Sequence, residues 1–96
     1  MQVSNKSITL HRDLKIINQY GMHARPAALF VKTAASFESE ITVEKGGNKV
    51  SGKSIMGMMT LEASKGSILK ITVTGPDAQE LVDALQTLVD RKFDED

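Results

Sequence analysis

The pattern of apolar and polar positions divides the chain into segments, each of which has the length of a single strand or helix. Partial alternation from Ile8 to Ile17 predicts a first strand, which ends in the turn-forming residues 18–21. The alanine-rich run 24–36 then places apolar side chains at helical spacing. This stripe is formed by Ala27, Phe30, Val31, Ala34 and Ala35.

A hairpin and a second helix are predicted in the middle of the chain. Residues 41–45 and 49–51 have the pattern of two short strands, joined by a turn that contains two glycines. Ser54 is a suitable N-cap for a helix that is expected to run to about Ser64, where Gly66 acts as a stop signal.

The last third of the chain predicts a strand and a final helix. Residues 67–74 alternate most clearly, and residues 75–77 break that strand. The apolar stripe of the last helix is formed by Leu81, Val82, Leu85, Leu88 and Val89. Four strands and three amphipathic helices bury their apolar sides most simply as two layers, an α+β arrangement with the helices on one face of the sheet. We expect one domain over residues 1–96, with the polar residues 1–6 loose.

Composition narrows the possible functions. A chain of 96 residues leaves little room for an enclosed substrate cavity, so any site is expected at the surface. Twelve Lys and Arg balance twelve Asp and Glu, and one Tyr and three Phe give no basic stacking platform for nucleic acid. The absence of cysteine fits a reducing cytoplasm, and no apolar run approaches the roughly 20 residues of a membrane span. We therefore expect a cytoplasmic protein without nucleic-acid or membrane partners, metal or cofactor.

The strongest candidate for chemistry is the octapeptide Gly21-Met22-His23-Ala24-Arg25-Pro26-Ala27-Ala28, at the expected start of the first helix. Glycine permits a sharp turn, and the first N–H groups of a helix face any anion held there. Histidine is a nucleophile at neutral pH, and arginine offers a forked cation for phosphate oxygens. This pattern predicts phosphoryl transfer, with His23 as acceptor and Arg25 stabilising the phosphoryl charge. His11 has no such setting and is given no role.

The segment Lys53-Ser54-Ile55-Met56-Gly57-Met58-Met59 is the second candidate. Ser54 is expected to cap the helix, and a phosphate on it would add about two negative charges near the positive helix end. Four apolar residues between positions 55 and 59 cover too much of the helix to be buried together. An exposed docking patch is therefore predicted, with a basic rim from Lys32, Lys53 and Lys65.

Together, in this order and at this distance, the two segments resemble the active-site and regulatory-serine motifs of the HPr family, the histidine-containing phosphocarriers of the bacterial phosphoenolpyruvate-dependent phosphotransferase system. The resemblance covers about Leu14 to the C-terminus. It implies an open-faced two-layer sandwich in which three helices cover one face of an antiparallel sheet of order 1-4-2-3. It also implies that phospho-enzyme I phosphorylates Nδ1 of His23 and that the group passes to enzyme IIA proteins for sugar uptake.

The resemblance also implies regulation and partner contacts. Ser54 would be phosphorylated by a dedicated serine kinase/phosphorylase, and the product would act with a catabolite-control regulator. The partner-binding residues carried over from the two motifs and their rim are Ala28, Lys32, Lys53, Ile55, Met56 and Met59. We expect a monomeric phosphoryl carrier rather than a stand-alone enzyme, because no paired carboxylates, metal cluster or triad partner accompanies the histidine.

Two alternatives stay open at this point. The ending Phe93-Asp94-Glu95-Asp96 resembles endings in the nitrogen-related branch of the family, called NPr. The segment around Ser54 favours the sugar branch and is given more weight, because an acidic tail can be only a solvated end. The other alternative is a non-carrier catabolite-repression binding module, but such paralogues lack the active histidine.

Overall fold

The computed structural model of the protein describes residues 7–95, so the segment 1–6, predicted to be loose, lies outside the described residues. Its elements are, in chain order, β1 Ile8–Lys15, α1 Ala24–Ala35, β2 Glu40–Lys45, β3 Asn48–Ser51, α2 Ile55–Thr60, β4 Ile68–Gly75, α3 Ala78–Asp90 and the short 3-10 helix η1 Lys92–Asp94.

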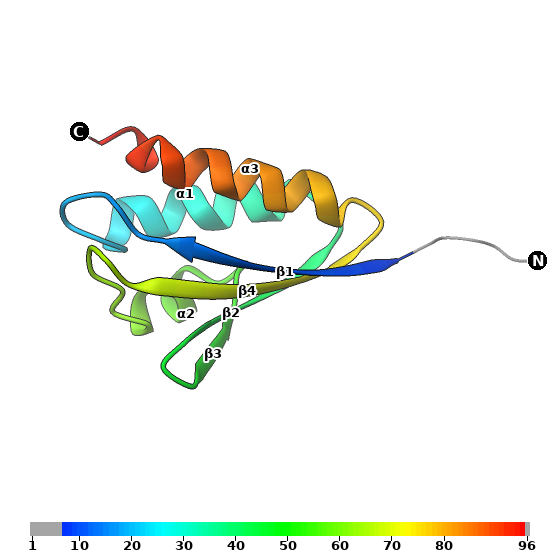
Figure 1. Ribbon diagram of the computed structural model, residues 1–96, viewed down its shortest axis with the longest axis horizontal. Helices are drawn as coiled ribbons and strands as arrows, with labels where there is room; N and C mark the ends of the chain where they lie inside the picture. The colour runs from blue at the N-terminus through cyan, green and yellow to red at the C-terminus, as the bar shows by residue number, and fades with distance from the viewer. Residues whose placement is uncertain (1–6, 96) are drawn as a thin grey trace, which may run out of the picture.

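The four strands form one antiparallel sheet in the order β1-β4-β2-β3 (Figure 1). Strand β1 pairs with β4 along its whole length, from Ile8 opposite Gly75 to Lys15 opposite Ile68. Strand β4 is therefore central, although it is the last strand in the chain. The predicted α+β class, the order of elements and the strand order 1-4-2-3 are confirmed.

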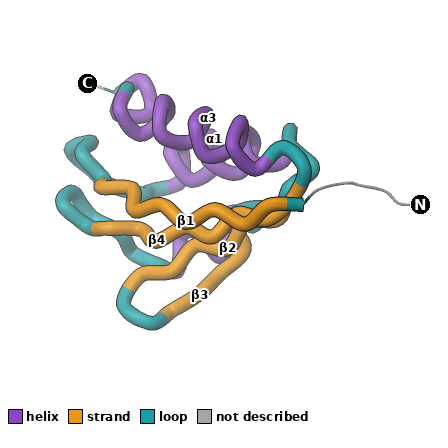
Figure 2. Tube along the Cα trace, turned by 45° about the vertical axis from the view of Figure 1, so that its right-hand side comes forward, coloured by secondary structure: helices purple, strands orange, loops and turns teal. Residues whose placement is uncertain are grey.

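One face of the sheet carries the core because side chains alternate across each strand. In β4, Leu69, Ile71 and Val73 are buried, whereas Lys70 and Thr74 on the other face are exposed. Helices α1 and α3 lie across the buried face (Figure 2). All three helices contribute to the same apolar cluster, through Phe30 of α1, Met58 of α2, and Leu81 and Leu85 of α3. No helix among residues 7–95 has the length and apolar character needed to cross a membrane.

Helix α2 is shorter than the sequence predicts, since it ends at Thr60 and not near Ser64. The chain leaves the helix at Glu62, whose φ of 50° lies in the left-handed region. The peptide oxygen of Ala63 then accepts a hydrogen bond of 2.8 Å from the backbone N–H of Met22. Residues expected to extend α2 thus fix the turn that precedes α1.

Asp77 connects the start of α3 to the loop before β2. Its carboxylate accepts hydrogen bonds from the backbone N–H groups of Glu38 and Ser39, both at 2.9 Å, and from the Ser39 hydroxyl at 2.5 Å. The bonds from the Ser39 hydroxyl and the Glu38 N–H hold the pKa of Asp77 below its ordinary value. The charged form of Asp77 is therefore the form that stabilises the fold.

We predict that Asp77→Asn lowers stability near neutral pH and reduces its dependence on pH. Because the folded pKa is depressed, the stabilisation is present above the unfolded pKa of about 3.9 and is lost as the pH falls through the folded value. Urea unfolding at about pH 7 and about pH 2.5 measures the effect. Asp83→Asn, on the exposed side of α3, is the control, and an equal effect of both substitutions would contradict the prediction.

Candidate functional site

His23 occupies the N-cap position of α1, with extended backbone angles of φ −84° and ψ −169°. Its ring makes no capping hydrogen bond, and 42% of its side chain is exposed. The backbone N–H of Ala27 bonds to the carbonyl of His23 at 2.9 Å, and Pro26 has no N–H. Only the N–H groups of Ala24 and Arg25 in this first turn lack an intrahelical acceptor, and they lie at the positive end of the helix.

The position of His23 depends on a glycine turn. Gly21 has a φ of +69°, and a Cβ atom there would lie 2.4 Å from the carbonyl oxygen of Ala63. A side chain at position 21 would therefore be both strained and in collision with the backbone. The next residue, Met22, is held by its buried side chain and by the hydrogen bond from its backbone N–H to the carbonyl of Ala63. This is the sharp turn into the site that the octapeptide predicted.

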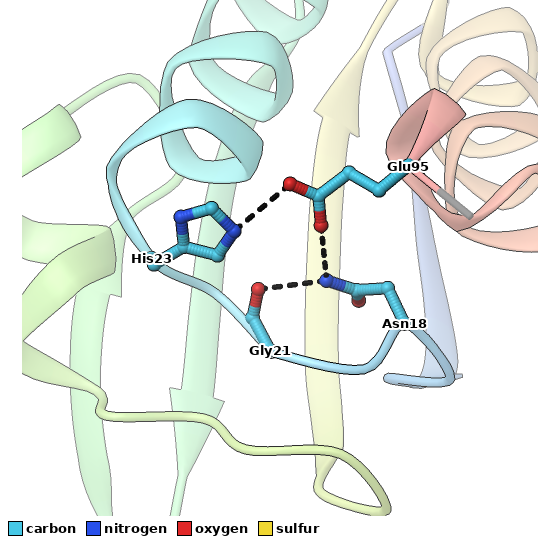
Figure 3. A network of polar contacts seen from close by, with 4 residues as sticks. All are labelled: Asn18, Gly21, His23 and Glu95. Carbon is cyan, nitrogen blue, oxygen red and sulfur yellow. Dashed lines mark hydrogen bonds and ion pairs between the residues drawn. The ribbon is translucent and has the colours of Figure 1, made fainter.

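One ring nitrogen of His23 is engaged by a carboxylate. Nε2 lies 2.9 Å from Oε2 of Glu95, and Oε1 of Glu95 accepts a hydrogen bond of 3.1 Å from Nδ2 of Asn18. The same Nδ2 donates to the carbonyl of Gly21 at 2.8 Å (Figure 3). An ionised carboxylate only accepts hydrogen bonds, so the contact requires a proton on Nε2. Nδ1 lies on the side of the ring away from Glu95 (Figure 3).

Arg25 is exposed in the first turn of α1. It lines a hollow of about 400 Å³ together with Gln19, Tyr20 and Glu95. Within the described part of the chain, no carboxylate forms an ion pair with its guanidinium. Tyr20 presents its ring edge-on to His23, with the ring centroids 6.4 Å apart. The guanidinium is thus available to an anion that approaches the start of α1.

The contact made by Glu95 was not predicted from the sequence. The acidic ending was given less weight because such a tail can be only a solvated end, but Phe93 is buried in the core cluster. Lys92, Phe93 and Asp94 have φ angles of 55°, 55° and 61°, and each such non-glycine residue costs on the order of 1 kcal/mol. The only sequence signal was Phe93 itself, a large apolar residue within an acidic ending.

Arg91 and Asp94 secure the same turn from outside. Nη2 of Arg91 lies 2.6 Å from Oδ2 of Asp94, and Nε lies 3.0 Å from Oδ1, which makes the pair bidentate. This hydrogen bonding lowers the pKa of Asp94 and raises that of Arg91. This ion pair helps to stabilise the left-handed turn that brings Glu95 to His23.

Ser54 is the N-cap of α2, and its hydroxyl accepts a hydrogen bond of 2.9 Å from the backbone N–H of Gly57. Lys53, expected in the basic rim, is half-buried, and its Nζ donates a hydrogen bond of 3.0 Å to the carbonyl of Phe37. This bond connects the start of α2 to the loop after α1.

Helix α2 presents apolar side chains to solvent. Exposed fractions are 43% for Ile55, 76% for Met56 and 42% for Met59, whereas Met58 is fully buried. On α1, which packs against α2, Ala28 is half-buried and Lys32 is exposed. We name Ile55, Met56 and Met59 the α2 patch.

Other features of residues 7–95 offer no competing centre. No group of three or more His, Cys, Asp or Glu in this range could hold a metal ion. A larger hollow, of about 880 Å³, lies between α1 and α3, but His23 and Arg25 do not line it. His11 lies on the open face of the sheet, where Nδ1 is 3.2 Å from the hydroxyl of Thr72.

Comparison with known proteins gives consistent results. Residues 10–91 match the family described as the PTS HPr component phosphorylation site. The chain is 42% identical over 86 residues to a phosphocarrier protein HPr of Neisseria meningitidis, covering 90% of this chain and 97% of that protein. The HPr-like protein Crh of Halalkalibacterium halodurans is 41% identical over 83 residues, covering 86% of this chain and 99% of that protein.

The fold agrees with the same family. The crystal structure of HPr-C-His from Thermoanaerobacter tengcongensis matches with a TM-score of 0.82 at 47% identity, over 95% of this chain and 98% of that chain. The matched residues 10–91 include His23, Arg25 and Ser54. The chain therefore belongs to the HPr family, the phosphocarriers of the phosphotransferase system.

Proposed function

We propose that the protein accepts a phosphoryl group from phospho-enzyme I on Nδ1 of His23 and passes it to enzyme IIA proteins for sugar uptake. The observation that carries the proposal is the exposed ring at the N-cap of α1, with Nε2 engaged by Glu95 and Nδ1 facing away from it (Figure 3). Nδ1 is thus the nitrogen open to a phosphoryl donor. The chain acts as a carrier, and His23 holds the group only between donor and acceptor.

The chemistry requires an in-line exchange between two nitrogen atoms. The lone pair of Nδ1 attacks the phosphorus of the donor phosphohistidine, and the electron pair of the broken bond returns to the donor ring. The guanidinium of Arg25 and the N–H groups of Ala24 and Arg25 stabilise the phosphoryl oxygens. Transfer to the acceptor reverses these steps. Partial exposure of the ring keeps this stabilisation moderate, as a carrier requires.

The nitrogen branch is the second candidate, and one observation favours it. The ending that resembles NPr proteins is not merely solvated, since Phe93 is buried and Glu95 contacts His23. The sequence argument for giving this ending little weight therefore no longer holds. In this alternative the same residues carry phosphate within a regulatory chain. The non-carrier catabolite-repression module is disfavoured because His23 is present and exposed.

The remaining expectations concern partners and regulation. We propose that a single domain over residues 1–96 acts as a cytoplasmic monomer. Enzyme I and the enzyme IIA proteins dock on the α2 patch together with Ala28, Lys32 and Lys53, because methionine-rich exposed surfaces adapt to several partners. A serine kinase/phosphorylase modifies Ser54, and a catabolite-control regulator recognises the product.

We predict that His23→Ala abolishes acid-labile phosphate uptake from phosphoenolpyruvate and enzyme I, whereas His11→Ala retains it. His11 is the matched control because it lies on the open sheet face. Parallel reactions with the sugar-type enzyme I and its nitrogen-branch counterpart identify the branch by the faster rate. Continued labelling of the His23 variant would contradict the proposed function.

Phosphorylation by a serine kinase and ATP, followed by mass spectrometry, is expected to modify Ser54. Ser54→Ala prevents the modification and lowers the free energy of unfolding by about 1 kcal/mol, because the N-cap bond to Gly57 is lost. Ser51→Ala is the control, since Ser51 is a nearby exposed serine that does not cap α2. An unmodified Ser54 would exclude the regulatory role.

The α2 patch is tested with two isoleucines of similar exposure, Ile55 at 43% and Ile68 at 41%. We expect Ile55→Ala to raise the KM for phospho-enzyme I about fivefold with little change in kcat, as for a contact residue of an interface. Ile68→Ala, in the sheet, is expected to leave KM within about twofold. Steady-state phosphotransfer measures both, and equal KM values for the two variants would show that docking occurs elsewhere.

A further inference from the structure

Glu95 lies beyond residues 10–91, which match the family model, whereas His23 lies within them. The match ends at residue 91, and Glu95 reaches His23 only because the chain turns back after α3 (Figure 3). The carboxylate is mostly enclosed, with 16% of its side chain exposed, so the bond is shielded from solvent more than an ordinary surface pair. Its two oxygens have separate partners, His23 and Asn18.

We propose that Glu95 is a positioning residue for the phosphoryl transfer that the proposed function assigns to His23. By accepting the proton of Nε2, Glu95 selects the tautomer in which Nδ1 carries a free lone pair. It also fixes the rotation of the ring, so that Nδ1 faces away from the protein segment that holds Glu95. Glu95 does not touch the phosphoryl group and acts only through the imidazole.

Charge development during transfer gives Glu95 a second effect. When the lone pair of Nδ1 forms the bond to phosphorus, the bond between phosphorus and the donor nitrogen breaks and its electrons return to the donor. The ring of His23 then carries phosphorus on Nδ1 and a proton on Nε2, and is therefore positively charged. The proton stays on Nε2 beside the Glu95 carboxylate, which stabilises this charge as it forms. When the phosphoryl group passes to the acceptor, the ring of His23 becomes neutral again and keeps its proton on Nε2.

Asn18 holds the Glu95 carboxylate in place. Asn18 is fully buried, and Nδ2 uses both of its hydrogens, one for Gly21 and one for Glu95. The opposite amide orientation would place Oδ1 against two acceptors, so the network fixes the orientation. Oδ1 itself is buried without a hydrogen-bond partner among the described residues. Unsatisfied buried groups and left-handed non-glycine residues, such as the three that precede Glu95, cluster at functional sites.

The test compares Glu95→Gln with Glu62→Gln. Glu62 lines a small hollow beside His23 but has no hydrogen bond to the ring, so both variants lose one negative charge near the same imidazole. We expect Glu95→Gln to reduce the rate constant of phosphoryl uptake about tenfold with KM for phospho-enzyme I nearly unchanged. Glu62→Gln should stay within about twofold of the wild type.

Nitrogen-15 NMR of labelled histidine supplies a readout that does not require phosphate. In the wild type and in Glu62→Gln, the Nε2–H proton of His23 should be protected from solvent exchange, and in Glu95→Gln this protection should be reduced, because a neutral amide is a weaker acceptor than a carboxylate. Equal uptake rates for wild type and Glu95→Gln, or equal losses in both variants, would overturn the proposal. If the wild type itself took up no phosphate, the proposed function would fail first, which distinguishes the two results.

Discussion

The antiparallel pairing of β1 with β4 is the interaction on which the rest of the structure depends. It joins the first strand to the last one, and it continues past the sheet through the bonds between Ile16 and Ser67 and between Gly66 and Ile16. The loop that leads to His23 is thereby fixed against the loop that leaves α2. Because α3 runs back over β1, the C-terminal turn reaches the same end of the molecule (Figure 1). Three segments distant in sequence therefore meet around one imidazole.

This meeting point resolves a conflict inherent in a carrier site. A phosphohistidine needs enough stabilisation to form, but deep burial among cations would prevent its release. In the proposed transfer, the helix end and Arg25 act on the phosphoryl oxygens from the exposed side, whereas Glu95, which contacts Nε2, acts on the opposite nitrogen from the protein side. Each contribution is moderate because the ring stays partly in water. Stabilisation is thus divided between the two ends of the ring.

The sequence predicted what is encoded locally and missed what depends on distant contacts. Alternation in residues 67–74 and the stripe from Leu81 to Val89 placed β4 and α3, but the strand order came only from the family resemblance. The end of α2 was misjudged because Gly66 is a strong stop signal, whereas nothing local marks the left-handed Glu62. Glu95 was missed for the same reason, since Asn18 and Glu95 are 77 positions apart.

His23 and Ser54 both precede helices, yet the structure treats their side chains differently. The hydroxyl of Ser54 caps α2 by accepting from Gly57, so a phosphate there would replace the native cap with a stronger one. The ring of His23 makes no capping hydrogen bond, so the first N–H groups of α1 stay free for the phosphoryl oxygens in the proposed transfer. A modification of Ser54 would therefore become part of the helix end and persist. A phosphoryl group on Nδ1 of His23 would displace no capping hydrogen bond of α1, which suits rapid transfer.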